Sequence, residues 1–61
     1  MLTLAAQTAA ERVKQSRALF RFQPMEARER RILHLALRDD PAVRTESEGE
    51  RDGRAVVVYP A

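Results

Sequence analysis

The absence of cysteine from a chain of only 61 residues is the tightest limit on what this chain can fold into. Disulfides and metal sites stabilise many domains of this size, and the lone histidine cannot complete a zinc shell by itself. One hydrophobic core must therefore hold the fold, with a net stability of roughly 3 to 5 kcal/mol. Two cores, or the clefts that most metabolic enzymes build between domains, do not fit into this length.

The charge distribution favours an anionic partner. The formal net charge is +2, but residues 1–38 carry +5 and residues 39–61 carry −3. All basic residues except one lysine are arginines, whose guanidinium groups suit forked recognition of phosphate. The sequence pI of about 9.9 also exceeds the value of about 9 that is typical of nucleic-acid-binding domains.

Hydrophobic patterning favours a cytoplasmic protein without a membrane span. The longest apolar run, residues 55–59, is far shorter than the roughly 18 residues that a span requires. The N-terminus also lacks the basic-then-apolar layout of a signal peptide.

The first half of the chain predicts a helix, a strand and a second helix. Apolar positions three and four residues apart predict a helix over Met1–Gln15 that begins at Thr3 or, from the capping-box spacing of Thr8 and Glu11, later. Alternation over residues 18–23 predicts a strand that buries Phe20 and Phe22. Proline is tolerated in the first turn of a helix, so the second helix is expected from Pro24 to about Arg38. It ends before Asp40-Pro41.

The second half predicts a β-hairpin. Residues 43–48 alternate, with Val43, Thr45 and Ser47 on one side of a strand. Residues 49–53 have the two glycines of a turn, and the valine-rich segment 54–59 forms the partner strand, which Pro60 ends. The expected fold is α+β, in the order helix-strand-helix-strand-strand, with both helices packed on one face of a small three-stranded sheet.

The second helix carries the candidate site. At about 100° per residue, its buried face is expected to hold Met25, Ile32, Leu33 and Ala36. The opposite arc holds four cationic or titratable side chains and no acid, namely Arg30, Arg31, His34 and Arg38. Arg30 and His34 lie four residues apart, on successive turns, and could converge on one phosphate.

Two structural alternatives explain the same residues without a ligand. Arg30 could pair with Glu26 one turn earlier, and His34 could be an ordinary surface histidine. The mutual repulsion of the cationic arc could also be relieved inside the protein by the acidic strand that carries Glu46 and Glu48.

These residues resemble the R-3-H domain family, which is named for an arginine and a histidine separated by three residues. The resemblance is carried in order by Arg30-Arg31-Ile32-Leu33-His34, by Thr45-Glu46-Ser47-Glu48-Gly49 and by Val56-Val57-Val58-Tyr59-Pro60. Within the family, the chain is most similar to the C-terminal domain of the bacterial Jag (KhpB, SpoIIIJ-associated) proteins. The helix start at Met25-Glu26 and the position of Gly53 depart from the usual pattern.

The resemblance implies a single-stranded nucleic-acid-binding domain that occupies residues 1–61. The partner would be single-stranded RNA, or alternatively DNA, whose backbone faces Arg30 and His34. Such proteins usually carry a KH domain before this one and are associated with cell elongation and division. The N-terminal helix, within residues 1–17, would then continue from a linker in a longer parent chain.

Other function classes have less support in the sequence. No nucleophile–base arrangement is recognisable, only two glycines are available for a phosphate-binding loop, and we expect no enzyme activity, cofactor or metal. Low base specificity is expected, because Tyr59 alone could stack on a base and is placed where it would pack at the end of the sheet. The alternative function is a protein-interaction module whose basic helix face docks an acidic partner.

Overall fold

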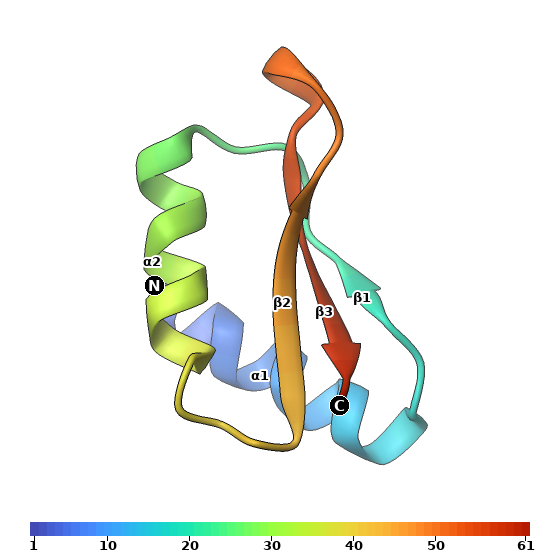
Figure 1. Ribbon diagram of the computed structural model, residues 1–61. Helices are drawn as coiled ribbons and strands as arrows, with labels where there is room; N and C mark the ends of the chain where they lie inside the picture. Colours follow the sequence, from blue (N-terminus) through green and yellow to red (C-terminus); the bar gives the residue numbers. More distant parts are fainter.

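The computed structural model describes all 61 residues as two helices and three strands (Figure 1). Helix α1 spans Leu2–Ser16, strand β1 Phe20–Arg21, helix α2 Ala27–Leu37, strand β2 Val43–Glu48 and strand β3 Ala55–Pro60. A short 3-10 helix, Arg51–Gly53, lies between β2 and β3. The predicted α+β order of helix, strand, helix, strand, strand is therefore confirmed.

The valine-rich strand β3 is the centre of the sheet. The strand order is β1-β3-β2, and both neighbours pair with β3 in the antiparallel sense. The β2–β3 register places Thr45 opposite Val58 and Ser47 opposite Val56. Since side chains alternate along a strand, Thr45, Ser47, Val56 and Val58 share one face of the sheet.

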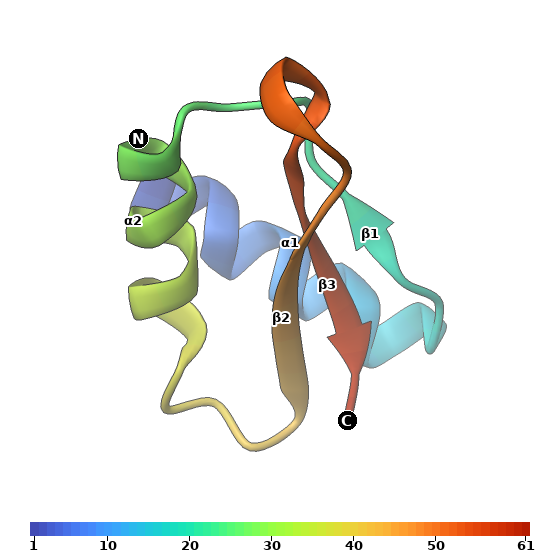
Figure 2. The ribbon, with the colours of Figure 1, turned by 45° about the horizontal axis from the view of Figure 1, so that its top comes forward.

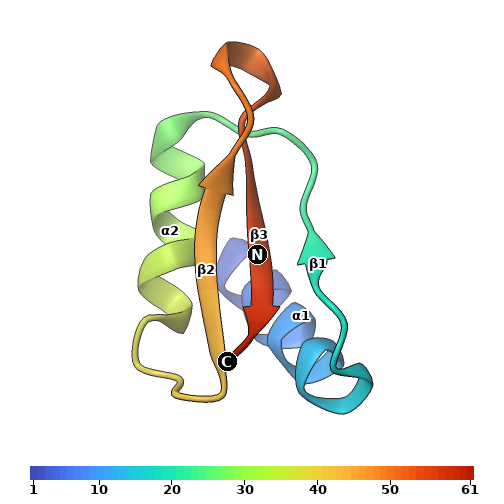
Figure 3. The ribbon, with the colours of Figure 1, turned by 45° about the vertical axis from the view of Figure 1, so that its right-hand side comes forward.

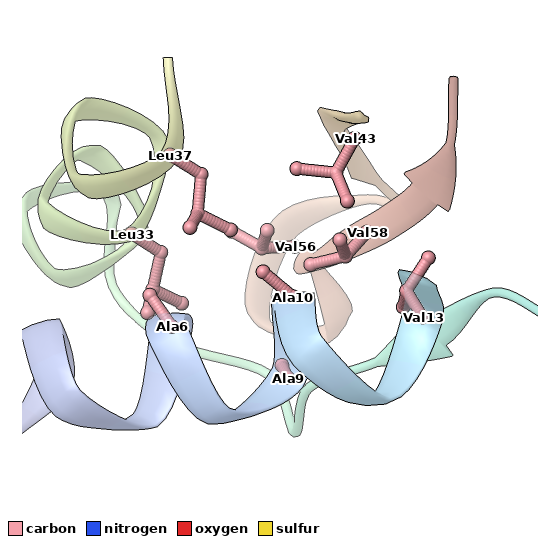
Figure 4. Packing of buried hydrophobic residues seen from close by; sticks show 9 residues of the cluster. All are labelled: Ala6, Ala9, Ala10, Val13, Leu33, Leu37, Val43, Val56 and Val58. Carbon is pink, nitrogen blue, oxygen red and sulfur yellow. The ribbon is translucent and has the colours of Figure 1, made fainter. Parts of the chain in front are cut away.

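Both helices pack against that same face, as expected. The core brings together residues of α1, α2 and the sheet, namely Ala6, Ala9, Ala10, Val13, Leu33, Leu37, Val43, Val56 and Val58 (Figure 4). Two further views show α1 running behind the sheet and α2 lying beside β2 (Figures 2 and 3). Small alanine side chains on α1 let its backbone approach the sheet closely, which suits a chain with few large apolar residues.

The opposite face of the sheet carries a ladder of polar side chains. Arg44 pairs with Glu46, and Arg21 pairs with Glu48 at 3.2 Å. The Tyr59 hydroxyl also donates a hydrogen bond to Glu48, and the guanidinium of Arg44 lies 4.4 Å from the centre of the Tyr59 ring. These side chains surround Val57, which is buried although it points away from the helices.

Strand β1 is shorter than the predicted segment 18–23. Only Phe20 and Arg21 have strand geometry, and they pair with Val58 and Val57 of β3 at one edge of the sheet. The chain nevertheless stays beside β3, since the Phe22 amide donates to the Val56 carbonyl at 2.9 Å. Phe20 and Phe22 are half-buried rather than fully buried, with their rings edge-to-face and 5.0 Å apart.

The start of each helix also differs from the expectation. Helix α1 begins at Leu2 with Met1 as its N-cap, so neither Thr3 nor Thr8 caps it. Helix α2 begins at Ala27 rather than Pro24, because the Met25 amide bonds the Arg54 carbonyl and keeps that segment extended. The Glu26 amide then donates to the Glu29 carboxylate at 3.3 Å, which is one half of a capping box.

Helix α2 is rotated relative to the expected orientation. Its buried residues are Leu33 and Leu37, whereas Ile32 is 39% exposed and Leu35 is 47% exposed. The buried face is therefore centred about 70° closer to Arg30 than the hydrophobic pattern predicts. Because α2 packs at the edge of the sheet, beside β2, the Arg30–His34 side of the helix turns toward β2.

Neither helix combines the length and apolar character that crossing a membrane requires.

The turn between β2 and β3 depends on Gly49, whose φ is +97°. A Cβ at this position would lie 2.6 Å from the Gly53 carbonyl oxygen.

We predict that Gly49→Ala lowers the free energy of unfolding by about 1 to 3 kcal/mol, measured by urea denaturation. Gly53→Ala is the matched control, because its Cβ would meet no atom within 4 Å, and should change stability by less than about 0.5 kcal/mol. Equal effects of the two substitutions would contradict the prediction.

Candidate functional site

His34 connects helix α2 to strand β2 through both of its ring nitrogens. Its Nδ1 lies 2.6 Å from Thr45 Oγ1, and its Nε2 lies 2.9 Å from Ser47 Oγ. All three side chains are half-buried. The imidazole is neither enclosed in the apolar core nor free in solvent, and its orientation is set by two hydroxyls on alternate residues of one strand.

Arg30 lies one turn before His34 and is held by the backbone instead of by an acid. Its Nε donates a 3.1 Å hydrogen bond to the Met25 carbonyl, in the extended segment just before α2. It forms no ion pair, so the helical pairing with Glu26 that the spacing allowed is not present. The bond through Nε restrains the guanidinium and leaves both of its Nη groups available as donors.

The other two predicted site residues lie farther round the helix. Arg31 is exposed and forms no ion pair. Arg38 caps the C-terminus of α2, is also exposed, and lies 3.8 Å from Asp39. The structure thus brings Arg30 and His34 together beside β2 and leaves Arg31 and Arg38 as cations on the outer surface.

The acidic residues of β2 do not neutralise this cationic surface. Glu46 and Glu48 alternate with Thr45 and Ser47, so they lie on the opposite face of the sheet. There they pair with Arg44 and Arg21. The alternative of charge compensation by the acidic strand is therefore wrong, because the residues of β2 that face α2, Thr45 and Ser47, are uncharged.

The surroundings of His34 favour its neutral form. Burial lowers the pKa of His34 below its usual value of 6.5, and the nearby Arg30 guanidinium lowers it further. No carboxylate contributes in the opposite direction. An anion bound beside His34 would supply the negative charge that the protein itself does not.

The aromatic side chains lie away from this group of residues. Tyr59 is half-buried on the opposite face of the sheet, with one side of its ring under Arg44 and its hydroxyl bonded to Glu48. It packs at the end of the sheet, as the sequence suggested. Phe20 and Phe22 contact the core from the β1 side. No aromatic ring therefore lies ready for base stacking beside Arg30.

Sequence reasoning missed two parts of this site. The alternation of residues 43–48 placed Thr45 and Ser47 on one side of a strand, which was the available signal, but nothing assigned them to His34. The contact of Arg30 with the Met25 carbonyl has no signal in the sequence, since any residue supplies a carbonyl.

No three histidine or acidic side chains converge in the structure as a metal site would require.

Comparison with known proteins assigns the chain to a family. Residues 1–60 match the R-3-H domain, and the chain belongs to the R-3-H domain family. A relative from Clostridium symbiosum, described as RNA-binding protein KhpB, is 39% identical over 57 residues, which are 93% of this chain. The chain spans only 26% of the length of that relative.

The influence of Arg30 on His34 can be measured by NMR titration of the imidazole. We predict that the pKa of His34 in the free domain lies below 6.5 and rises in Arg30→Gln, because a repelling cation is removed. Arg31→Gln is the control, since it removes the same charge from the next position. An equal rise of the His34 pKa in both variants would contradict the assignment of this repulsion to Arg30.

The stability of the domain should also depend on His34 between pH 8 and pH 5.5. The unfolded chain binds the His34 proton more tightly than the folded domain does, so the contribution of the neutral imidazole is complete above about pH 6.5. It is lost as the pH falls from there through the lowered pKa of the folded state. The free energy of unfolding of the natural sequence should therefore decline over this range.

His34→Gln is the control for this pH dependence and should show a flatter profile. Asp40 does not interfere, because its hydrogen bond with the Lys14 ammonium lowers its pKa below the usual value of 3.8, outside this pH range. Identical profiles from pH 8 to pH 5.5 for the two proteins, measured by urea denaturation, would contradict the prediction.

Proposed function

We propose that this domain binds single-stranded RNA through backbone phosphates, on the face of α2 that carries Arg30, His34, Arg31 and Arg38. Membership of the R-3-H family supports this proposal, as does the description of the KhpB relative as RNA-binding. We propose a non-catalytic binding role, because the second ring nitrogen of His34 contacts the Thr45 hydroxyl and not the carboxylate that would complete a catalytic triad with Ser47.

The observation that carries the proposal is the state of Arg30. Its guanidinium is restrained by the Met25 carbonyl, has no acidic partner, and lies beside His34 at the surface. A restrained guanidinium with free Nη groups loses little side-chain entropy on binding and can donate two parallel hydrogen bonds to one phosphate. The exposed Arg31 and Arg38 add positive charge on the outer side of the same face.

Binding is expected to be weak and to depend little on base identity. Contacts to phosphate carry no sequence information, and the aromatic rings lie elsewhere. Two to four neutralised phosphates correspond to a slope of about −1.4 to −2.8 in log affinity against log salt concentration. Single-stranded DNA, which has the same phosphates, is a second ligand to compare.

At the level of the whole protein, we propose a cytoplasmic, KhpB-like regulator of cell elongation and division in which a KH domain accompanies this one. Two linked modules that each bind RNA weakly gain affinity, because the second contact becomes intramolecular. The support is the family resemblance together with the KhpB relative, of which this chain matches 26%.

A second candidate function is docking of an acidic protein partner. Ile32 and Leu35 are exposed on α2 next to Arg31, an arrangement that also suits contact with a protein. RNA binding rests on Arg30 and His34, which lie beside β2, whereas protein docking would rest on the exposed Ile32 and Leu35. Substitutions in each pair therefore distinguish the two functions.

The RNA-binding proposal is tested by fluorescence anisotropy with a labelled 12-nucleotide oligouridylate. We predict that Arg30→Gln weakens binding at least about tenfold, because charge-assisted hydrogen bonds to phosphate are lost. The salt slope should fall in magnitude by about 0.7, the amount expected for one phosphate contact.

Arg12→Gln is the charge-matched control for this experiment. Arg12 lies on α1 and lines a surface hollow together with Phe20, beside β1 and so at the edge of the sheet away from β2. The Arg12→Gln substitution should lower the affinity for RNA much less than Arg30→Gln does. If the natural sequence and Arg30→Gln bind the RNA equally, the proposal is wrong and the protein-docking function becomes the leading one.

A further inference from the structure

The hydroxyls of Thr45 and Ser47 are placed to do more than hold the His34 ring. They lie 2.6 Å and 2.9 Å from its two nitrogens, on the face of β2 that meets α2. Both side chains are half-buried, so solvent reaches this interface. The one-turn spacing on α2 brings the unpaired guanidinium of Arg30 next to the same ring.

Counting protons shows what the two hydroxyls can offer to a ligand. A neutral imidazole has one N–H, so it donates to one hydroxyl and accepts a hydrogen bond from the other. The hydroxyl that accepts keeps its own O–H free, whereas the hydroxyl that donates to the ring has only lone pairs left. The neutral site therefore presents one donor and one acceptor from β2.

Protonation of His34 changes this pattern. Both ring nitrogens of an imidazolium donate, so both hydroxyls accept from the ring and both of their O–H groups are free to point outward. The site then presents two hydroxyl donors beside the Arg30 guanidinium and a second positive charge. This is an arrangement for binding an anion, and it forms without breaking either contact between His34 and β2.

No group in the protein compensates the added charge. On α2, Arg30 repels it, Arg31 and Arg38 are also cationic, and the facing residues of β2 are neutral. Glu46 and Glu48 lie on the other face of the sheet in contact with arginines, and on α1 Lys14 is paired with Asp40. The β3 residues opposite Thr45 and Ser47 are Val58 and Val56. A bound phosphate is thus what would stabilise protonated His34.

We propose that Thr45 and Ser47 donate hydrogen bonds to the phosphodiester oxygens of a bound single strand, and that His34 is a positioning residue whose protonation turns both hydroxyls toward the ligand. This inference rests on the proposed RNA-binding function and adds two ligand contacts from β2. Binding of a strand then takes up a proton at His34.

The test uses anisotropy titrations of the same labelled oligouridylate between pH 8 and pH 6. Affinity of the natural sequence should rise as the pH falls, and His34→Gln should remove this dependence. Thr45→Val and Ser47→Ala should each weaken binding about three- to tenfold at pH 6, and less at pH 8, because only one free hydroxyl donor exists when His34 is neutral. Arg12→Gln should keep the pH profile of the natural sequence.

A measurement on the natural sequence covers the case in which a hydroxyl variant does not fold. The pKa of His34, followed by NMR, should rise when saturating oligouridylate is added, and an unchanged pKa would overturn the proposal. The proposal would also be overturned if the folded variants Thr45→Val and Ser47→Ala bound oligouridylate with the affinity and pH dependence of the natural sequence. If Arg30→Gln still loses binding in that case, the RNA-binding function stands and only the hydroxyl contacts are wrong.

A comparison of RNA with DNA distinguishes a contact with phosphate from a contact with the sugar. A single-stranded oligodeoxyuridylate of equal length has the same phosphates but lacks the 2′-hydroxyl. The losses caused by Thr45→Val and Ser47→Ala should be the same for the two strands. A loss seen with RNA alone would overturn the assignment to phosphate and indicate a contact with the ribose.

Discussion

The pairing of β2 with the central strand β3 is the constraint on which the rest of the molecule depends. It sets which residues of β2 face the helices, and a shift of one residue would exchange Thr45 and Ser47 for Glu46 and Glu48. In that register, carboxylates would meet Arg30 and His34, and the cationic surface would be neutralised. The observed register gives α2 two neutral hydroxyls and sends the acids to the other face, where Arg44 and Arg21 pair with them.

The small core and the site are parts of one arrangement. Helix α2 buries Leu33 and Leu37 against α1 and the sheet. Burial of these two leucines sets the rotation of the helix about its axis and turns its Arg30–His34 side toward β2. Arg30 and His34 therefore lie at the border between core and solvent, where a hydrogen bond is partly protected from water and a charge is still accessible. The same rotation leaves Ile32 and Leu35 exposed, which a helix with a fully buried apolar stripe would not do.

The restraint of Arg30 and His34 distinguishes this site from an ordinary basic surface. Arg31 and Arg38 are long, exposed side chains whose positive charge acts at a distance and is screened by salt. Arg30 and His34 are held by hydrogen bonds to the Met25 carbonyl and to the two hydroxyls of β2. A small domain can in this way present an oriented group of donors, because each side chain is fixed by its own neighbour.

The sequence by itself determined the order of elements, the alternation of β2 and the four-residue spacing of Arg30 and His34, since these depend on local periodicity and on turn residues. It also carried the family resemblance. Only the tertiary structure decided where α2 begins, which of its faces is buried, and what Arg30 and His34 touch. The reason is physical: periodicity describes a helix alone, whereas the rotation of α2 is set by packing against α1 and an edge of the sheet. The partners of its side chains then follow from the β2–β3 register, which joins residues far apart in the chain.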